Sequence, residues 1–309
     1  MSPNVVHPDL RFVARFLPSG VARKWLLPVL RWLKPPAGAM PRGLVVREMA
    51  LPGTTATVRI VGPVDDERGR PVLLWMHGGG YIIGSAVQDD ALCARYAQRL
   101  GVTVVSVDYR LAPEHPWPAP LDDCVAAYDF VQREAAALGL DPRRVIVAGQ
   151  SAGGGLAAAL VLRLHDSGRP APIFQLLVYP MLDDRTAART VEGLTLRVWD
   201  QESNVLGWSS YLARAPGGDG VTDHMAPARR EDLRGLPPAW IGVGTLDLFH
   251  DEDLAYARRL VEAGVPASLE VVDGAFHGFD AVMPKAPVSR AFFDAQVAAV
   301  AGVLSGAAR

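Results

Sequence analysis

The pentapeptide Gly-Gln-Ser-Ala-Gly at residues 149–153 constrains the fold of this chain more than any other stretch. An apolar run precedes it at residues 145–148, and a run of small and aliphatic residues follows at residues 154–160. This order is typical of a strand that turns sharply into a helix and presents a serine hydroxyl at the edge of a sheet. Side chains on the two flanking glycines would crowd the neighbouring strand and helix. Ser151 is therefore the candidate nucleophile.

Strand-like and helix-like segments alternate along most of the chain. Several of the strand-like segments are continuous runs of Val, Ile and Leu, as expected of parallel strands buried on both faces. The predicted strands are Leu44–Met49, Ala56–Val61, Val72–Met76, Val102–Val107, Val145–Ala148, Phe174–Val178, Ala239–Val243 and Ser268–Val272. The predicted helices are Asp89–Leu100, Leu121–Leu138, Ser151–His165, Glu252–Ala263 and Ser289–Leu304. The first two strands alternate in polarity around a Pro-Gly pair, which predicts an antiparallel hairpin at a sheet edge. The whole pattern predicts an α/β fold, in which helices cover both faces of a mostly parallel sheet.

Two segments do not follow this alternation. Residues 1–43 contain short helical patterns broken by prolines, and residues 183–225 contain Trp199, Trp208 and Tyr211 before a glycine-rich loop. We expect a single domain over residues 1–309, with these two segments packed together as a cap over the carboxyl ends of the strands, where open α/β sheets bind ligands. A basic amphipathic stretch in the first segment would also suit a membrane surface, but its prolines favour packing on the protein body.

The composition argues against several other classes of protein. The net charge of −2 and the isoelectric point of about 6.4 provide no field that would attract nucleic acid. We find no apolar stretch of the length that spans a bilayer, and the N-terminus lacks the residue order of a signal peptide. Cys93 and Cys124 are the only cysteines, which favours two buried free thiols in a cytoplasmic protein over a disulfide framework.

A serine nucleophile needs a base, and that base needs an acid to orient it. In sheet hydrolases with this type of turn, the chain order is serine, acid, histidine. Three of the seven histidines follow the helix predicted after the turn, and of these His277 lies after Asp247, an acid that ends a predicted strand, and just past the next predicted strand. We therefore expect His277 to take the proton of Ser151 and Asp247 to orient the imidazole. Asp251 and Asp253 are nearby alternatives, but they fall within the next predicted helix and are expected to be structural.

A glycine-rich loop follows the predicted strand that ends at Met76. Gly78, Gly79 and Gly80 have no side chains, so their N–H groups can approach a substrate oxygen. We expect an oxyanion hole in this loop, with Gly79, Gly80 and the N–H of Ala152 as its donors. His77 is expected to shape the loop through hydrogen bonds and not to act as a base.

With these parts in place, the chain resembles the hormone-sensitive-lipase-like (family IV) carboxylesterases of the α/β-hydrolase fold. The resemblance runs from His77 to about Phe279 and rests on several motifs in the same order. These are the His-Gly-Gly-Gly-Tyr loop at 77–81, Asp-Tyr-Arg-Leu-Ala-Pro-Glu at 108–114, the serine turn, Tyr-Pro at 179–180, Asp-Leu-Phe-His-Asp-Glu at 247–252 and Phe-His-Gly-Phe at 276–279. The resemblance implies an eight-stranded sheet, an N-terminal cap, and hydrolysis of short- to medium-chain acyl esters with neither a metal nor an organic cofactor.

Three further expectations concern individual residues. The family usually has Asp or Glu before the nucleophile, whereas this chain has Gln150, a neutral amide that can keep similar hydrogen bonds without a negative charge. Arg110 and Glu114 are expected to form an ion pair that braces their loop. The last predicted strand, at 268–272, would leave an open sheet edge that could pair with a second copy in a homodimer.

The predicted function is a serine carboxylesterase that forms a covalent acyl-enzyme on Ser151. The aromatic residues of the cap and the loop after Gly80 are expected to bind a neutral, partly apolar acyl group of a small-molecule ester. An amide, carbamate or formamide hydrolase would use the same residues and stays an alternative. A receptor that binds a ligand on this fold without turnover is a second alternative, which is less favoured because serine, acid and histidine are all present.

Overall fold

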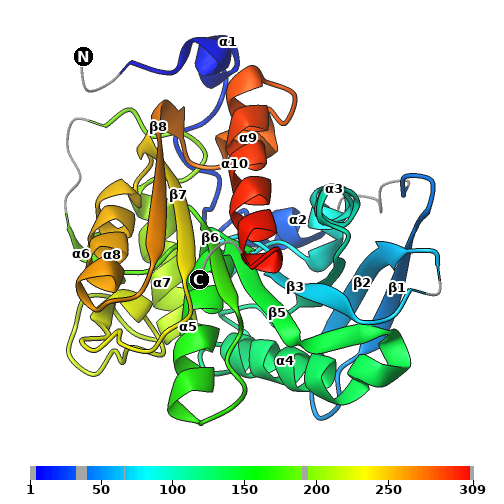
Figure 1. Ribbon diagram of the computed structural model, residues 1–309. Coiled ribbons are helices and arrows are strands. Elements are labelled where there is room, and N and C mark those ends of the chain that lie inside the picture. Colours follow the sequence, from blue (N-terminus) through cyan, green and yellow to red (C-terminus); the bar gives the residue numbers. More distant parts are fainter. Residues whose placement is uncertain (1–4, 33–39, 66, 190–193, 307–309) are drawn as a thin grey trace.

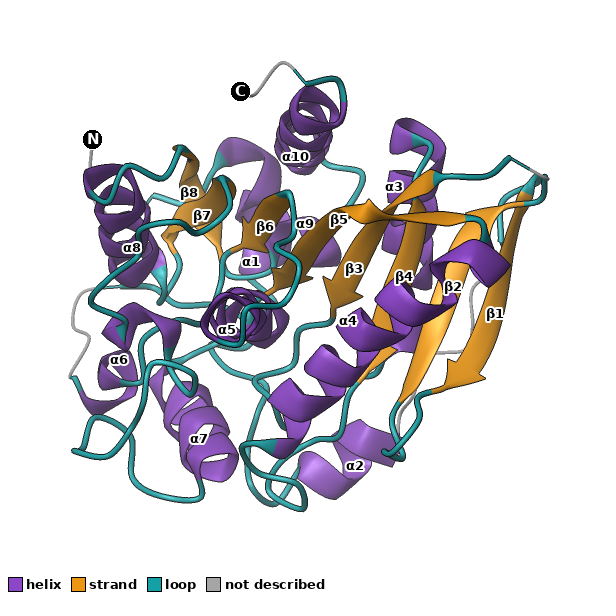
Figure 2. Ribbon diagram, turned by 60° about the horizontal axis from the view of Figure 1, so that its bottom comes forward, coloured by secondary structure: helices purple, strands orange, loops and turns teal. Residues whose placement is uncertain are grey.

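The computed structural model describes residues 5–32, 40–65, 67–189 and 194–306 of the chain. At its centre lies a sheet with the strand order β1-β2-β4-β3-β5-β6-β7-β8 (Figures 1 and 2). The strands are β1 Leu44–Ala50, β2 Thr57–Pro63, β3 Arg70–Met76, β4 Thr103–Asp108, β5 Leu140–Gln150, β6 Phe174–Val178, β7 Ala239–Leu246 and β8 Ala267–Phe276. β2 is antiparallel to both β1 and β4, and every other neighbouring pair is parallel. The predicted eight-stranded, mostly parallel sheet and its edge hairpin are therefore confirmed.

The continuous apolar runs are explained by helices on both faces of the sheet. Along β5, Val145 and Val147 pack into one hydrophobic cluster, while Ile146 and Ala148 between them pack into another. This follows from the strand geometry, because successive side chains point to opposite faces. α4 (Ala119–Leu138) and α5 (Ala152–Asp166) cover the first face, and α3 (Asp90–Leu100) and α10 (Pro287–Leu304) cover the second (Figure 2).

All five predicted helices are present, with ends that differ from the prediction by a few residues at most. α3 and α4 each stop at a left-handed glycine, Gly101 and Gly139, which is a common way to end a helix. α8 covers His250–Glu262 and includes Asp251 and Asp253, as expected. One further helix of ordinary length, α7 Gln201–Leu212, lies in the second segment outside the alternation. The remaining helical segments are short: η1 Pro8–Leu10, α1 Arg11–Ala14, α2 Leu27–Trp32, η2 Ala86–Asp89, α6 Arg185–Ala188, η3 Pro227–Arg229 and α9 Phe279–Val282.

The two segments outside the alternation contact each other. Val21 donates from its backbone N–H to the carbonyl of Val198, and Val198 donates to the carbonyl of Pro18, with N to O distances of 3.1 and 3.0 Å. Arg23 pairs with Asp200, 2.7 Å from guanidinium nitrogen to carboxylate oxygen. Residues 1–4, 33–39 and 190–193 of the predicted cap lie outside the described residues.

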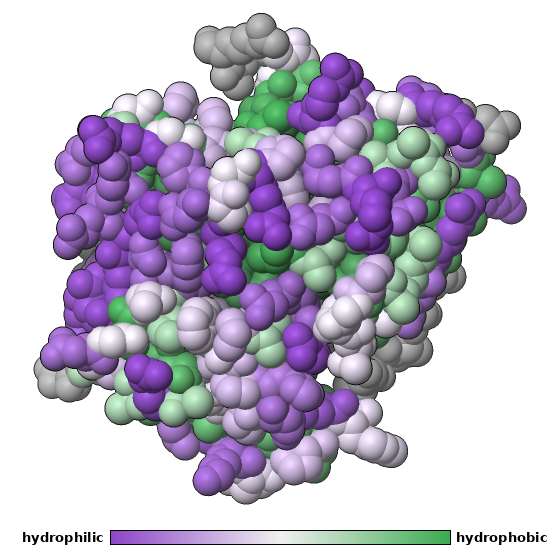
Figure 3. All heavy atoms as spheres, turned by 90° about the horizontal axis from the view of Figure 1, so that it is seen from below, coloured by the Kyte–Doolittle hydropathy of each residue, from purple (hydrophilic) through white to green (hydrophobic). Residues whose placement is uncertain are grey.

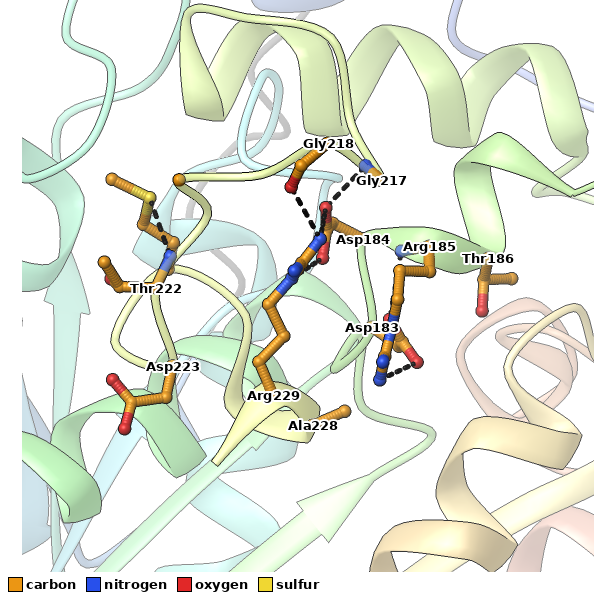
Figure 4. Close-up of polar contacts among 12 residues, drawn as sticks. Asp183, Asp184, Arg185, Thr186, Gly217, Gly218, Thr222, Asp223, Ala228 and Arg229 are labelled. Atoms are coloured by element: carbon orange, nitrogen blue, oxygen red, sulfur yellow. Dashed lines mark hydrogen bonds and ion pairs between the residues drawn. The ribbon is translucent and has the colours of Figure 1, made fainter. Parts of the chain in front are cut away.

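A buried carboxylate joins the start of the second segment to its glycine-rich loop and to η3, which follows the segment (Figure 4). Asp184 accepts two hydrogen bonds from the guanidinium of Arg229, at 2.6 and 2.9 Å, and one from the backbone N–H of Gly217 at 2.6 Å. Because three donors surround a carboxylate that is out of contact with water, these loops are held at fixed positions beside the sheet.

The expected ion pair between Arg110 and Glu114 is wrong. The guanidinium of Arg110 lies 2.8 Å from the carboxylate of Asp123 in α4, and Glu114 instead pairs with Arg31 of α2 at 2.6 Å. Asp123 is fully buried and also accepts a hydrogen bond from the backbone N–H of Arg110. Leaving its carboxylate without a cation would therefore cost more free energy than leaving the half-exposed Glu114 unpaired.

The N-terminal segment packs on the body less completely than expected. Leu27 of α2 is buried, but Trp25 and Trp32 are 78% and 82% exposed. In the face shown in Figure 3, hydrophilic residues predominate and hydrophobic ones form small, separate patches. Within the described ranges, none of the helices combines the length and apolar character needed to cross a bilayer.

Candidate active site

Ser151 stands in a strained turn between β5 and α5. Its backbone angles are φ 55° and ψ −123°, which a residue with a side chain rarely adopts. A Cβ on Gly149 would lie 2.3 Å from the carbonyl oxygen of Gly153, and a Cβ on Gly153 would lie 2.1 Å from that of Met76. Both distances are far below van der Waals contact, so the predicted steric need for the two flanking glycines is confirmed.

The structure brings Ser151, His277 and Asp247 into contact in series. The Nε2 atom of His277 is 2.9 Å from the Oγ of Ser151, and its Nδ1 atom is 2.8 Å from Oδ2 of Asp247. All three side chains are buried, with 6% or less of each residue exposed. They come from the ends of β5, β7 and β8, which lie at the same edge of the sheet.

Neighbouring groups fix the orientation of the acid and the imidazole. The Oδ1 atom of Asp247 accepts from the backbone N–H of Phe249 at 2.9 Å, which leaves Oδ2 directed at the imidazole. The rings of Tyr179 and Phe249 pack edge-on against His277, with centroid distances of 4.8 and 5.1 Å. The imidazole is therefore held between two aromatic rings and a carboxylate.

The two alternative acids do not contact His277. The side chain of Asp251 is 93% exposed and bonds to His250, its neighbour in the chain. Asp253 is fully buried, and neither of its carboxylate oxygens has a hydrogen-bond partner in the described part of the chain. Burial raises the pKa of Asp253 well above its usual range. Of the three candidate acids, only Asp247 is placed to orient the imidazole.

The glycine loop lies beside Ser151. The N–H groups of Gly79, Gly80 and Ala152 donate to no backbone or side-chain acceptor among the residues that the structure describes. Gly78 and Gly79 line the same cavity as Ser151, whereas Gly80 packs against Trp199, where a Cβ would lie 2.0 Å from the indole ring. Backbone donors without partners beside a serine hydroxyl are what an oxyanion hole requires.

His77 is built into the base of this loop. Its Nδ1 atom lies 2.8 Å from the carbonyl oxygen of Gly78, and its ring stacks on Tyr109 with 4.2 Å between centroids. Burial lowers the pKa of His77, because the imidazolium form would be poorly solvated. The ring makes no hydrogen bond to Ser151, and its contacts agree with the expected role in shaping the loop.

A cavity of about 300 Å³ opens beside the serine hydroxyl, and we call it the Ser151 cavity. Its walls outside the serine, histidine and glycine loop are mostly apolar and come from the two predicted cap segments, the loop after Gly80 and α9: Val21, Leu30, Ile83, Val198, Trp199, Ala281 and Val282. No motif marks most of these residues, and sequence reasoning identified only Trp199 among them individually.

Of the cap aromatics expected to bind the acyl group, only Trp199 lines the Ser151 cavity. Trp208 and Tyr211 are buried against Tyr81, with ring centroids 5.5 and 4.1 Å away. That expectation was wrong for these two residues, because their rings pack with Tyr81 in the hydrophobic core. Among the described residues there is no group of three or more His, Cys, Asp or Glu side chains that could hold a metal ion.

Gln150, the unusual residue of the serine turn, belongs to a buried polar network. Its amide nitrogen donates to both carboxylate oxygens of Asp89, which also accepts from the indole of Trp75 at 2.7 Å. Its amide oxygen accepts from Tyr179, whose hydroxyl lies 2.9 Å from the carboxylate of Asp280. Burial raises the pKa of Asp89 to about 7 and also raises that of Asp280.

Comparison with known proteins places this geometry among ester hydrolases. A family model described as alpha/beta hydrolase fold matches residues 73–281, a range that contains Ser151, Asp247 and His277. The chain is 37% identical over 259 residues to the carboxylesterase NlhH of Mycobacterium tuberculosis, covering 81% of this chain and 80% of that protein. It is 34% identical over 234 residues to the ethyl acetate hydrolase of Pseudomonas putida, covering 74% and 72%. A bacterial heroin esterase has a similar solved structure, with a TM-score of 0.88 at 36% identity over 97% of this chain and 98% of that one.

Proposed function

We propose that this chain, which belongs to the alpha/beta hydrolase family and is a carboxylic ester hydrolase, cleaves short- to medium-chain acyl esters through a covalent acyl-enzyme on Ser151. One observation carries the proposal: the imidazole of His277 bridges the hydroxyl of Ser151 and the carboxylate of Asp247, at 2.9 and 2.8 Å. That arrangement provides a nucleophile, a base and a group that stabilises the charged base.

In the first half of the reaction, Nε2 of His277 takes the hydroxyl proton as Oγ of Ser151 attacks the ester carbonyl carbon. The carbonyl oxygen gains the negative charge and accepts hydrogen bonds from the free N–H groups of Gly79, Gly80 and Ala152. The bond to the alcohol oxygen then breaks, and the imidazolium gives its proton to the leaving alcohol. The product is an ester of the acyl group with Ser151.

Water repeats the same steps in the second half of the reaction. Nε2 of His277 takes a proton from the water as its oxygen attacks the acyl carbon, and the same proton returns to Oγ of Ser151 when the acid leaves. Asp247 keeps its negative charge throughout and stabilises the imidazolium in both halves.

The walls of the Ser151 cavity support a small, neutral, apolar acyl group. The cavity holds about 300 Å³, at the small end of the range for ligand pockets, and most of its lining side chains are aliphatic or aromatic. The relative named ethyl acetate hydrolase agrees with a short acyl group. We also propose that the segments containing Val21 and Val198 form the cap that closes this cavity.

A ladder of p-nitrophenyl esters from acetate to palmitate, with a formanilide as the amide control, tests this proposal. We expect kcat/KM to be highest for acyl chains of about two to eight carbons, because longer chains exceed the cavity. The matched control is Ser151→Ala on the same substrates. A maximum at palmitate would contradict the acyl-length proposal, and faster cleavage of the formanilide than of the esters would favour the amidase alternative.

We further propose a homodimer that pairs through β8. This strand is at the edge of the sheet, and its side chains Leu269 and Val271 are each 40% exposed. An apolar edge strand of this kind is a common site of strand pairing. Light scattering of the purified protein should give twice the chain mass, and the variant Leu269→Lys/Val271→Lys should give the mass of one chain. A wild-type monomer would contradict the proposal.

The cysteines support a cytoplasmic location. Cys93 and Cys124 are both buried and free, and free thiols persist in a reducing compartment. We propose this location, and immunoblots of fractionated native cells test it: the protein should appear with the cytoplasmic fraction, and recovery from the medium or the membrane pellet would contradict it.

A further inference from the structure

A second cavity, of about 560 Å³, lies on the other side of Gln150 from the serine, and we call it the side cavity. It is enclosed by α3, by the chain from α9 to α10, and by the start of α10, which lie close together in Figure 1. The side cavity shares Gln88, Gln150 and Ala281 with the Ser151 cavity, so these three residues form a common wall.

Three cations line the side cavity. Arg95, Lys285 and Arg290 make no side-chain hydrogen bond or ion pair with any residue that the structure describes. The guanidinium of Arg95 stacks on the ring of Phe293, 3.7 Å from the ring centroid. A guanidinium stacked in this way keeps its N–H edge free for an anion. The side cavity therefore presents unpaired positive charge to whatever enters it.

The two acids of the side cavity do not neutralise these cations. Asp89 accepts hydrogen bonds from Trp75 and Gln150, and Asp280 is bonded to the hydroxyl of Tyr179. Burial raises the pKa of Asp89 to about 7 and also raises that of Asp280, which reduces their negative charge near neutral pH.

An unpartnered hydroxyl provides independent support for a ligand. Ser289 lines the side cavity and is only 2% exposed, yet its Oγ has no hydrogen-bond partner among the described residues. Buried polar groups are nearly always hydrogen-bonded, so an unpaired hydroxyl on a cavity wall indicates a missing partner. Leu92, Pro284 and Phe293 make part of the same wall apolar.

We propose that the side cavity is a second binding site for a carboxylate that bears a short apolar chain. The carboxylate pairs with Lys285, Arg290 and the free edge of Arg95, Ser289 donates to it, and the chain packs on Leu92 and Phe293. This is the chemical class of the acid that ester hydrolysis releases. The biological role of the site therefore rests on the proposed function. The binding itself depends only on the side cavity.

Titration calorimetry with octanoate tests the site on the full-length protein. In the variant Lys285→Glu/Arg290→Glu, we expect affinity to fall by roughly tenfold or more, because two charged contacts become repulsive. The matched control is Arg99→Glu/Arg258→Glu, which has the same change in charge at two exposed arginines outside the side cavity. This control should bind octanoate as the wild type does. Thermal melting verifies that both variants are folded.

A second variant and a second probe keep the test independent of folding and of catalysis. Ala91→Trp should fill the side cavity without changing its charge and should also weaken octanoate binding. 1-Octanol, which has the chain without the charge, should bind more weakly than octanoate. Equal octanoate affinity in all variants, or octanol binding as tight as octanoate binding, would overturn the proposal. Octanoate is not hydrolysed, so these results stand whether or not Ser151 is the nucleophile.

Discussion

The side-chain amide of Gln150 donates to both carboxylate oxygens of Asp89, at 3.2 and 3.3 Å. Asp89 is buried, and its only other hydrogen bond in the described part of the chain comes from Trp75. An acidic residue at position 150, as is usual in the family that the sequence resembles, would place two carboxylates against each other here. The neutral amide of Gln150 avoids this repulsion and donates a hydrogen bond to Asp89 instead.

Gln150→Glu should therefore destabilise the protein, and more strongly at high pH than at low pH. Below the raised pKa of Asp89, about 7, a proton can be shared by the two carboxyl groups; above it, both carry charge. We expect a loss of about 1–3 kcal/mol in the free energy of unfolding at about pH 8, and less at about pH 5. Urea unfolding at both pH values measures this, and an unchanged stability at the higher pH would contradict it.

The wild-type protein should itself lose stability as the pH rises from about 4 to about 8. Burial raises the pKa of Asp89 to about 7 and that of Glu252 to about 8, well above their values in an unfolded chain. The folded state then binds more protons than the unfolded state in this interval. Each group's contribution to the free energy of unfolding is therefore complete at low pH and is lost as the pH rises through the raised pKa.

The size of this loss is on the order of a few kcal/mol in total. Asp89→Asn removes one of the two groups and should make the dependence of unfolding free energy on pH less steep. Chemical unfolding at a series of pH values measures both slopes. If the slope of Asp89→Asn equals that of the wild type, Asp89 does not titrate in this range.

Asp247→Asn should lower kcat by about four orders of magnitude, as the equivalent change does in serine proteases. An amide at this position presents the wrong hydrogen-bonding group to Nδ1 of His277 and cannot stabilise the imidazolium. Asp251→Asn is the matched control, because Asp251 is exposed and does not contact the imidazole of His277. This variant should retain wild-type kcat. If kcat falls less than tenfold in Asp247→Asn, another acid orients the imidazole of His277.

Gly79→Val should reduce kcat/KM by about a hundredfold or more, the usual effect of losing an oxyanion donor. A Cβ at Gly79 would lie 2.0 Å from the carbonyl oxygen of Ile83, and its φ of +129° is unfavourable for any residue with a side chain. The loop must therefore move. Gly53→Val is the control: its φ is also positive, at +79°, but nothing lies within 4 Å of its Cβ position. Similar losses in both variants would show that the effect is general strain.

The sequence was sufficient for the parts of the molecule that depend on local pattern. Apolar runs identified the strands because a strand buried on both faces needs an unbroken run, and the glycines around Ser151 identified the turn because nothing larger fits there. Asp247 and His277 were found because each follows a predicted strand in the required order.

Contacts between distant segments could not be predicted in the same way. Arg110 pairs with Asp123, although Glu114 is nearer to it in the sequence. The reason is burial, because an unpaired carboxylate is destabilised more in the protein interior than at the surface. The apolar residues of the Ser151 cavity and the cations of the side cavity are single positions in unrelated segments. Only the folded chain shows that they are neighbours.

The rate of p-nitrophenyl butyrate hydrolysis by Ser151→Ala tests the central claim most directly. If the hydroxyl of Ser151 attacks the ester, kcat should fall by roughly five to six orders of magnitude, as it does when a serine hydrolase loses its nucleophile, while the melting temperature stays close to that of the wild type. A folded Ser151→Ala protein with kcat within tenfold of the wild type would contradict the account.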